Sequence, residues 1–303
     1  MKRHRTSAAL RCTHFGTWRA LAALPAMTGS VLLLVVLLGG LGRWEGPALL
    51  AWMAAGLLAL TRTWERVVLR FVCRARAPMA DEAAALEPIR LDVLDRCGLG
   101  PDRIDLCIAD LRGRNAYAAG ARSIILTREL SRDYLAGKIG RDVLAAVLCH
   151  EVGHHVTGAL KVTPVVQWLT LPWRLGCRVG AKIASRFLAG QPRPLLAAVV
   201  LIALSLAIGQ AVQLREWGSA AVLCGLVPAM VGSPIADAAI SRASERAADS
   251  YAAQHGYAAS LQQALRVLDV ADANRSHGFL RSHPTPERRI RDLAIVGLAK
   301  AQS

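Results

Sequence analysis

The stretch "VLCHEVGHHV", Val147 to Val156, decides the fold because it places three histidines and one glutamate on a short apolar segment. The residues Arg141 to Thr157 are predicted to form a helix, and on a helix positions i and i+4 lie on one face. His150 and His154 can therefore direct two imidazoles at one cation. Glu151, about 100° around the helix, can reach a water molecule bound to that cation. The H-E-x-x-H pattern predicts a catalytic zinc centre with the glutamate as general base.

Two neighbours of this motif receive structural interpretations. His155 is turned away from the pair and is predicted to be a structural or surface histidine. Cys149 could be regarded as a ligand, but a small buried hydrophobic residue on a helix is the favoured interpretation.

The seven cysteines are scattered, odd in number and lack a C-x-x-C pair. They indicate neither a disulfide framework nor a thiolate zinc site, and they are typical of a reducing compartment.

A catalytic zinc also needs a third protein ligand and an open position for water. The best candidate is Glu245, in "SRASERAADSYAAQHG". Asp249 lies four residues later, shares the same helical face and could orient a ligating histidine. The alternative is that both carboxylates belong to a solvated helix face, which is the usual fate of such a pair. The upstream motif favours the ligand interpretation.

The composition points to a membrane rather than to nucleic acid. Apolar residues make up 53% of the 303 residues and gather in Leu/Ala/Val runs, and the formal net charge is +15. Because the basic residues are not interleaved with aromatics, we expect no nucleic-acid partner. Many of them flank the apolar runs, which agrees with the positive-inside rule: Lys2, Arg3, Arg5, Arg11, Arg19, Arg62, Arg66, Arg70, Arg74 and Arg76.

Four apolar runs are candidates for membrane spans. Leu21 to Leu41 and Pro47 to Leu60 are predicted to form a hairpin of two spanning helices, with a signal peptide as the competing interpretation of the first run. Leu195 to Leu214 and Gly218 to about Ala236 are predicted to form a second hairpin. The apolar stretch from Thr163 to Ala189 is interrupted by prolines and basic residues, which favours an interfacial helix over a spanning one.

The two polar segments between and after the predicted hairpins are expected to be water-soluble and to lie on the same side of the membrane. The stretches "DRIDLCIAD" and "ARSIILT" predict short strands within an α+β segment. The predicted domains are an N-terminal transmembrane hairpin (1–64), a first catalytic segment (65–193), a second transmembrane hairpin (194–240) and a C-terminal catalytic segment (241–303). Basic flanks place the N-terminus in the cytoplasm, and two crossings each time return the chain there. A site shared by the two polar segments is therefore possible.

Four motifs in order resemble one known family. "HEVGH" is followed, after two predicted spans, by "ERAAD"; "RNAYAAGARSIILT" precedes the pair and "SHPTPERRIRDL" follows it. From Asn115 to Leu293 the chain resembles the M48 zinc metallopeptidases, which include HtpX-type bacterial membrane proteases and CAAX-processing Ste24 proteases. The N-terminal pair of spans is similar to the HtpX-type layout. Tyr117 stands where phenylalanine is typical and Ser282 where threonine is common, and both are mild departures.

The resemblance implies an α+β fold with a gluzincin-like zinc metalloprotease domain, mainly helical with a small sheet. The apolar runs add about four transmembrane helices to this domain. The resemblance implies one zinc ion per chain. It also implies that Asn115 and the strand through Ala118 bind extended substrate, and that His283 and Arg289 bind substrate or stabilise the oxyanion. Two structural alternatives stay open, an ordinary strand with Tyr117 in the core and a turn histidine at position 283. The implied catalytic set is His150, His154 and Glu245 as zinc ligands and Glu151 as general base. Asp249 is implied to orient a ligating histidine.

The expected function is hydrolysis of peptide bonds in membrane-associated or misfolded polypeptides by an integral membrane zinc endopeptidase. We expect it in the bacterial inner membrane, with the active site facing the cytoplasm and the lipid bilayer and polypeptides as its partners. An intramembrane metalloprotease is one alternative, although ionisable residues in and beside the motif helix make burial in lipid expensive. A catalytically silent or autoinhibited zinc-binding adaptor is another. The substrate, its cleavage preference and the oligomeric state are left open.

Overall fold

The structure, a computed structural model, describes residues 15–58, 60–71, 73–158, 163–187, 193–227, 232–268 and 285–301. Contacts within the chain separate two compact units. The first, called the α/β unit here, comprises Met1–Trp18, Thr61–Lys161 and Ile240–Ser303. The second, called the helical unit, comprises Arg19–Leu60 and Val162–Ala239. Each unit is therefore built from segments that are far apart in the sequence.

The α/β unit contains a four-stranded mixed sheet. Its strands are β1 (Ala75–Arg76), β2 (Asp105–Ala109), β3 (Ala116–Ala119) and β4 (Ser123–Thr127), in the order β1-β2-β4-β3. The pair β2–β4 is parallel, whereas β1–β2 and β3–β4 are antiparallel. The strands predicted from "DRIDLCIAD" and "ARSIILT" are confirmed as β2 and β4. The short strand β3 forms one edge of this sheet.

The turn between β3 and β4 is held by a glutamate from a neighbouring helix. Glu65, on α3 (Arg62–Phe71), accepts hydrogen bonds from the backbone N–H of Ala121 at 2.9 Å and from the Ser123 hydroxyl at 2.6 Å. Gly120 in this turn has φ +57°, and the Glu65 carboxylate occupies the space that a Cβ would need. Glycine is therefore required here by both conformation and space.

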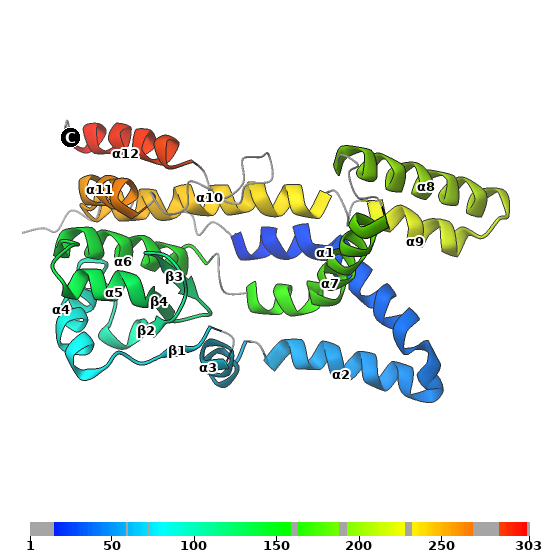
Figure 1. Ribbon diagram of the computed structural model, residues 1–303, viewed down its shortest axis with the longest axis horizontal. Coiled ribbons are helices and arrows are strands. Elements are labelled where there is room, and N and C mark those ends of the chain that lie inside the picture. Colours follow the sequence, from blue (N-terminus) through cyan, green and yellow to red (C-terminus); the bar gives the residue numbers. More distant parts are fainter. Residues whose placement is uncertain are drawn as a thin grey trace, which may run out of the picture. The chain divides into compact units, whose positions relative to one another are not determined.

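In the described residues, seven helices complete the α/β unit around a main apolar core, and a smaller apolar cluster lies beside it. In Figure 1 the sheet lies beside α4, α5 and α6. The core draws on α4, β2, β3, β4, α5, α6, α10, α11 and α12. Its largest fully buried side chains include Leu86, Ile89, Leu94, Ile104, Ile108, Ile124, Leu126, Leu130, Leu144, Leu148 and Leu293. The helices are α3, α4 (Ala80–Arg96), α5 (Arg128–Leu135), α6 (Arg141–Val156), α10 (Ser233–Gln254), α11 (Ala258–Leu268) and α12 (Pro286–Ala301), with a short 3₁₀ turn η2 (Pro101–Arg103). The first residues of α10 fall in the helical unit.

The motif helix α6 agrees with the predicted range Arg141 to Thr157. All residues from Val143 to Gly153 are buried, so this helix is enclosed by protein on every side over three turns. A helix that is apolar all round belongs in the interior of a domain or a bilayer, and here α4, β3 and α11 pack against it. The histidines of the motif are consequently fixed by a rigid surrounding.

The helical unit consists of apolar helices with many exposed side chains. It contains α1 from Arg19 onward (α1 spans Phe15–Leu38), the 3₁₀ segment η1 (Gly39–Trp44), α2 (Glu45–Leu58), α7 (Thr163–Phe187), α8 (Arg193–Gln213) and α9 (Trp217–Val227). Trp168 Nε1 donates to the Trp52 carbonyl at 2.9 Å, and the Trp173 N–H donates to the Ser30 hydroxyl at 3.1 Å. Helices α8 and α9 run side by side as a hairpin (Figure 1).

Among the described residues, one stretch has the length and hydropathy of a membrane span. It covers Phe15–Leu58 and is divided by the turn at Gly42, where φ is +54°. A shorter apolar helix covers Ala198–Gln213. The two predicted hairpins fall on α1–α2 and α8–α9, but four spans remain a prediction. Helix α7 continues through Pro172 as one 25-residue helix and is absent from the candidate spans found in the described ranges.

Candidate metal centre

The two histidines of the motif converge as the helical spacing predicts. On α6 the rings of His150 and His154 are 4.8 Å apart between centroids and almost perpendicular to each other. His150 is buried and His154 is half-buried. One face of a buried helix therefore offers two imidazole nitrogens.

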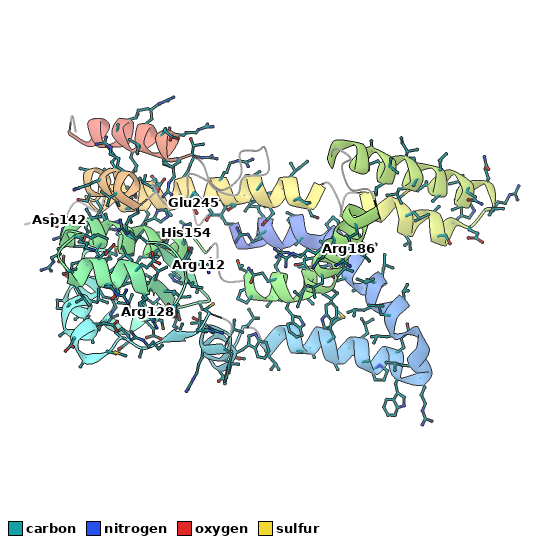
Figure 2. All side chains as sticks on the ribbon, viewed as in Figure 1. Arg112, Arg128, Asp142, His154, Arg186 and Glu245 are labelled. Carbon is teal, nitrogen blue, oxygen red and sulfur yellow. The ribbon has the colours of Figure 1, made fainter. Side chains whose placement is uncertain are left out.

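Helix α10 brings a carboxylate to the same point. Glu245 Oε2 lies 3.5 Å from His150 Nε2, and Glu245 Oε1 lies 3.4 Å from His154 Nε2. The three donor atoms lie within 4.8 Å of one another, and Figure 2 shows Glu245 on α10 facing His154 on α6. Two helices that are separated in sequence by the whole of α7, α8 and α9 thus build one cluster.

Glycine at position 153 explains how the two helices come so close. A Cβ on Gly153 would lie 3.0 Å from the Ala248 Cα and 3.2 Å from the Ala248 carbonyl oxygen. Both are backbone atoms of α10, which cannot swing aside as a side chain could. The glycine of "HEVGH" therefore sets the separation of α6 and α10, and with it the distance from the histidines to Glu245.

The donor set fits zinc in both chemistry and spacing. Two imidazole nitrogens and one carboxylate are the ligands of many catalytic zinc sites. Two atoms that each lie about 2.0–2.1 Å from one zinc at the tetrahedral angle are separated by about 3.3–3.5 Å. The His150–Glu245 and His154–Glu245 separations, 3.5 and 3.4 Å, match this value. An ion could therefore be held without rearrangement of these two pairs.

Asp249 stands directly behind one of the candidate ligands. Its Oδ1 lies 2.9 Å from His150 Nδ1, on the side of the ring opposite to Glu245. Burial lowers the pKa of His150, but interactions with Asp249 and Glu245 outweigh this effect and raise the pKa to about 9. The carboxylates that favour a proton on this imidazole equally favour a metal cation beside it. Asp249 therefore orients the ring and leaves Nε2 facing the cluster.

Arg289 contacts two carboxylates of the cluster, those of Asp249 and Glu245. Its guanidinium from α12 makes two hydrogen bonds to Asp249, Nη2 to Oδ1 at 2.6 Å and Nε to Oδ2 at 2.9 Å, and Nη1 lies 3.5 Å from Glu245 Oε2. Burial raises the pKa of Asp249, but hydrogen bonds from His150 and Arg289 more than offset this and hold the pKa below its usual value. A fork of this kind fixes both carboxylates in place. The arginine thus supports the ligands as well as lying close to the reaction centre.

Ser244 is a residue of the cluster that the sequence did not single out. Its hydroxyl lies 3.2 Å from His154 Nδ1, on the ring nitrogen opposite to Glu245. Ser244 therefore holds His154 much as Asp249 holds His150. Its position immediately before the predicted ligand was the available signal, but serine is too common on helices for that signal to be specific.

Glu151 connects the motif helix to the edge strand. Its Oε2 accepts a hydrogen bond of 2.6 Å from the backbone N–H of Ala118 on β3. Burial is the main influence on this carboxyl and raises its pKa. The general-base candidate is thus buried beside the predicted substrate strand, which suits a group that must accept and release a proton near neutral pH.

Strand β3 presents an open edge. Asn115 and Thr127 are joined by two hydrogen bonds, from the Thr127 N–H to the Asn115 carbonyl and from the Asn115 N–H to the Thr127 hydroxyl. Because antiparallel pairs alternate, the main-chain groups of Ala116 and Ala118 point away from β4. Tyr117 is 40% exposed, so its side chain is outside the core. The Asn115 side-chain oxygen accepts from the Ala116 N–H at 2.9 Å.

The remaining histidine of the motif has a structural role, as predicted. His155 Nε2 lies 3.1 Å from the carbonyl oxygen of Ser123, so the ring ties α6 to β4. Burial lowers the pKa of His155 to about 4. His283, the other predicted catalytic residue, lies outside the described residues.

Comparison with known proteins identifies the family. The family model described as peptidase family M48 matches residues 80–295, which include every candidate residue of the centre. The chain belongs to peptidase family M48. No curated protein matches the chain. Among solved structures, the crystal structure of S. mikatae Ste24p is similar, with 18% identity and a TM-score of 0.47. That match covers 92% of this chain, which spans 65% of the length of the S. mikatae protein.

Family membership confirms the resemblance that the four motifs predicted. The mainly helical fold with a small mixed sheet is also confirmed. M48 peptidases are zinc-dependent, and the cluster of His150, His154 and Glu245 could hold a metal ion.

Proposed function

We propose that this M48 peptidase is an integral membrane zinc endopeptidase, with His150, His154 and Glu245 as ligands and Glu151 as general base. The observation that carries the proposal is the meeting of α6 and α10. Two imidazoles and one carboxylate face one point at zinc-like separations, and a buried carboxyl lies next in sequence to the first histidine. Only hydrolysis requires that additional carboxyl at this place.

Several residues of the chain have separate roles in the proposed reaction. Bound zinc would supply a Lewis acid that makes water ionise close to neutral pH. Glu151 accepts the proton of the attacking water and later delivers it to the leaving amine, a double role that its raised pKa favours. Asp249 and Ser244 hold the two histidines in orientation. Arg289 fixes the carboxylates and places a positive charge beside the centre, where it would also help to stabilise an oxyanion.

Substrate recognition is proposed to use the edge of β3. An extended polypeptide can add to an open edge through main-chain hydrogen bonds, which depend little on its sequence. The outward-facing groups of Ala116 and Ala118 would make these bonds once their N–H groups leave Asn115 Oδ1 and Glu151, with Asn115 at the start of the strand. The Ala118 N–H now bonded to Glu151 places that edge directly beside the base. Such a site suits unfolded or membrane-associated polypeptides, and His283 is proposed to assist at the same centre.

The location in a membrane is supported by the helical unit. Large apolar side chains are exposed along its helices, and the stretch Phe15–Leu58 qualifies as a span. We propose that residues 1–64 and 194–240 form two transmembrane hairpins around the catalytic segments 65–193 and 241–303. The basic flanks support an orientation with these catalytic segments on the cytoplasmic side of a bacterial inner membrane.

The intramembrane alternative is disfavoured by the surroundings of the motif helix. Its buried residues, Val143 to Gly153, are covered by the α/β unit itself rather than exposed to an apolar solvent. The adaptor alternative predicts the same zinc-binding residues but no cleavage. An experiment must therefore distinguish the adaptor from the peptidase by measuring activity.

The test compares the wild type with Glu151→Gln, both purified in detergent with zinc restored. We expect the wild type to cleave an unfolded model protein and the variant to be slower by about 10²–10⁴-fold, since it lacks the general base. Both should bind the same amount of zinc, and a chelator should stop the wild type. Glu129→Gln, an exposed carboxyl of the same unit, is the matched control and should retain activity. Zinc bound by both proteins with no cleavage by either would favour the adaptor.

A further inference from the structure

A second cluster of candidate metal-binding side chains lies where the end of α4 and the end of α10 meet the middle of α6. Cys97, Cys149 and His255 offer three donor atoms within 4.8 Å of one another. Cys97 follows the end of α4, Cys149 precedes His150 on α6, and His255 follows the end of α10. All three belong to the α/β unit, and none has a part in the proposed hydrolysis.

The two sulfurs are in contact at a distance that a shared metal ion would also give. Cys97 Sγ and Cys149 Sγ are 3.7 Å apart, within reach of an S–H···S hydrogen bond. Two thiolates bound at about 2.3 Å to one zinc at the tetrahedral angle would be separated by about 3.8 Å. A disulfide would need a separation of about 2.05 Å, so the two sulfurs as placed are not bonded to each other. The observed spacing accepts an ion bound to both sulfurs.

The histidine presents its second nitrogen as a free ligand. His255 Nδ1 lies 2.8 Å from the Tyr251 carbonyl, which can only accept, so Nδ1 carries the proton. This tautomer leaves the lone pair on Nε2, the arrangement that most metal-bound histidines share. The Tyr251 ring also packs against the imidazole at 4.3 Å between centroids, which fixes its orientation.

Charge and burial suit a divalent ion at this place. Two thiolates and a neutral imidazole around a divalent cation form a group without net charge, which limits the cost of burying it. Cys149 is fully buried, whereas Cys97 and His255 are half-buried, so an ion can enter from one side.

We propose that Cys97, Cys149 and His255 form a second metal site for a zinc-class divalent ion. The ion joins the end of α4, the motif helix and the end of α10. It thereby ties together the two helices that carry His150, His154 and Glu245. Three protein donors leave one position for water, so this site is expected to release its ion more easily than a closed four-ligand site.

The experiment uses cobalt as the probe. The purified full chain is stripped of metal under reducing conditions and titrated with Co²⁺, and bound cobalt is measured by mass spectrometry together with the near-ultraviolet absorption. The centre formed by histidines and Glu245 contains no sulfur, so a thiolate-to-cobalt charge-transfer band reports on the second site alone. We expect about two cobalt ions per chain and a strong thiolate band.

Four variants decide the interpretation. Cys97→Ser and His255→Ala should each lower the stoichiometry to about one ion and remove or weaken the thiolate band. Cys107→Ser, a half-buried cysteine on β2, is the matched control and should change neither. His154→Ala should lose the other ion and all hydrolysis but keep the band. That variant makes failure of the hydrolytic proposal distinguishable from failure of this one.

Three results would overturn the second site. The first is one cobalt per chain without a thiolate band in the wild type. The second is a band that survives both Cys97→Ser and His255→Ala. The third is a Cys97–Cys149 disulfide, detected by alkylation and peptide mass before reduction, which would mean that the pair is redox-active rather than metal-binding.

Discussion

The two units use similar apolar residues in opposite ways. In the α/β unit Leu144 is 0% exposed, whereas in the helical unit Val36 is 78% exposed and Leu206 is 70% exposed. Burying such side chains is the main driving force of folding in water. The α/β unit buries such side chains in its own core, whereas the helical unit leaves many of them exposed. Exposed apolar faces of this extent indicate another apolar phase, which supports the proposed lipid bilayer.

Their buried polar groups differ as well. In the α/β unit four ionisable side chains are buried at one place, and each has a charged or polar partner: His150, Glu151, Glu245 and Asp249. In the helical unit Ser30 and Thr170 are buried, and their hydroxyls contact backbone groups of helices. Buried ionisable clusters are expensive and usually mark function. Buried hydroxyls on helices serve packing.

The largest effect should come from removing a ligand in the α/β unit. Glu245→Ala should lower zinc affinity by about 10²–10³-fold, one ligand's share of the binding free energy, and should abolish hydrolysis. The matched change in the helical unit, Glu216→Ala, alters an exposed carboxylate and should affect neither. Metal analysis after dialysis against a zinc buffer measures the difference. Full zinc retention by Glu245→Ala would remove this residue from the ligand set.

Shortening apolar side chains should separate the two units clearly. Leu144→Ala leaves a cavity in a closed core and should cost about 2–5 kcal/mol of unfolding free energy. Val36→Ala should cost less than about 0.5 kcal/mol, because its side chain is exposed. Thermal unfolding in detergent provides the comparison. An equal loss in Val36→Ala would show that this face packs against protein and would contradict its assignment to lipid.

Charge insertion tests the same contrast in a membrane. Val36→Arg should oppose insertion of the first span by up to about 2.5–3.5 kcal/mol. Leu135→Arg, at an exposed position that ends α5, should leave membrane attachment unchanged. The fraction that resists alkaline extraction from membranes measures attachment. If both variants stay attached equally, α1 is not what anchors the chain.

The smallest effect concerns two helical glycines. Gly153→Ala gains helix propensity but forces α10 away from α6, and we expect a net loss of about 1–3 kcal/mol together with weaker zinc binding. Gly180→Ala on α7 meets open space and should be neutral or stabilising by up to about 1 kcal/mol. Unfolding and zinc titration of the two variants test this. Unchanged zinc affinity in Gly153→Ala would show that the helix separation does not control the centre.

The sequence predicted what depends on neighbouring residues. The spacing of His150 and His154 and the extent of α6 follow from helical periodicity, and the strands β2 and β4 follow from their apolar content and flanking turns. The strand through Ala118, now β3, was expected through the family resemblance. Glu245 was predictable because its partner Asp249 lies one helical turn away.

Contacts between distant segments escaped prediction. Cys97 and Cys149 are 52 positions apart, and no local pattern marks them, so sequence reasoning indicated no thiolate metal site. Arg289 was expected at the substrate, but its two hydrogen bonds to Asp249 depend on how α12 packs, 40 positions away. The bond from Ala118 to Glu151 likewise depends on how β3 packs against α6. Such contacts are set by packing, which local periodicity does not contain.

The proposed zinc ligands lie in two separate parts of the chain, so they are synthesised at different times. His154 and Ser244, the residue before Glu245, are separated by 90 positions. At about 5–20 residues per second, the histidines leave the ribosome several seconds before the third ligand exists. An unfinished chain therefore holds two of the three proposed zinc ligands, and under the proposed function it could not cut the polypeptides that emerge beside it. Activity would begin only after the C-terminal segment has been made.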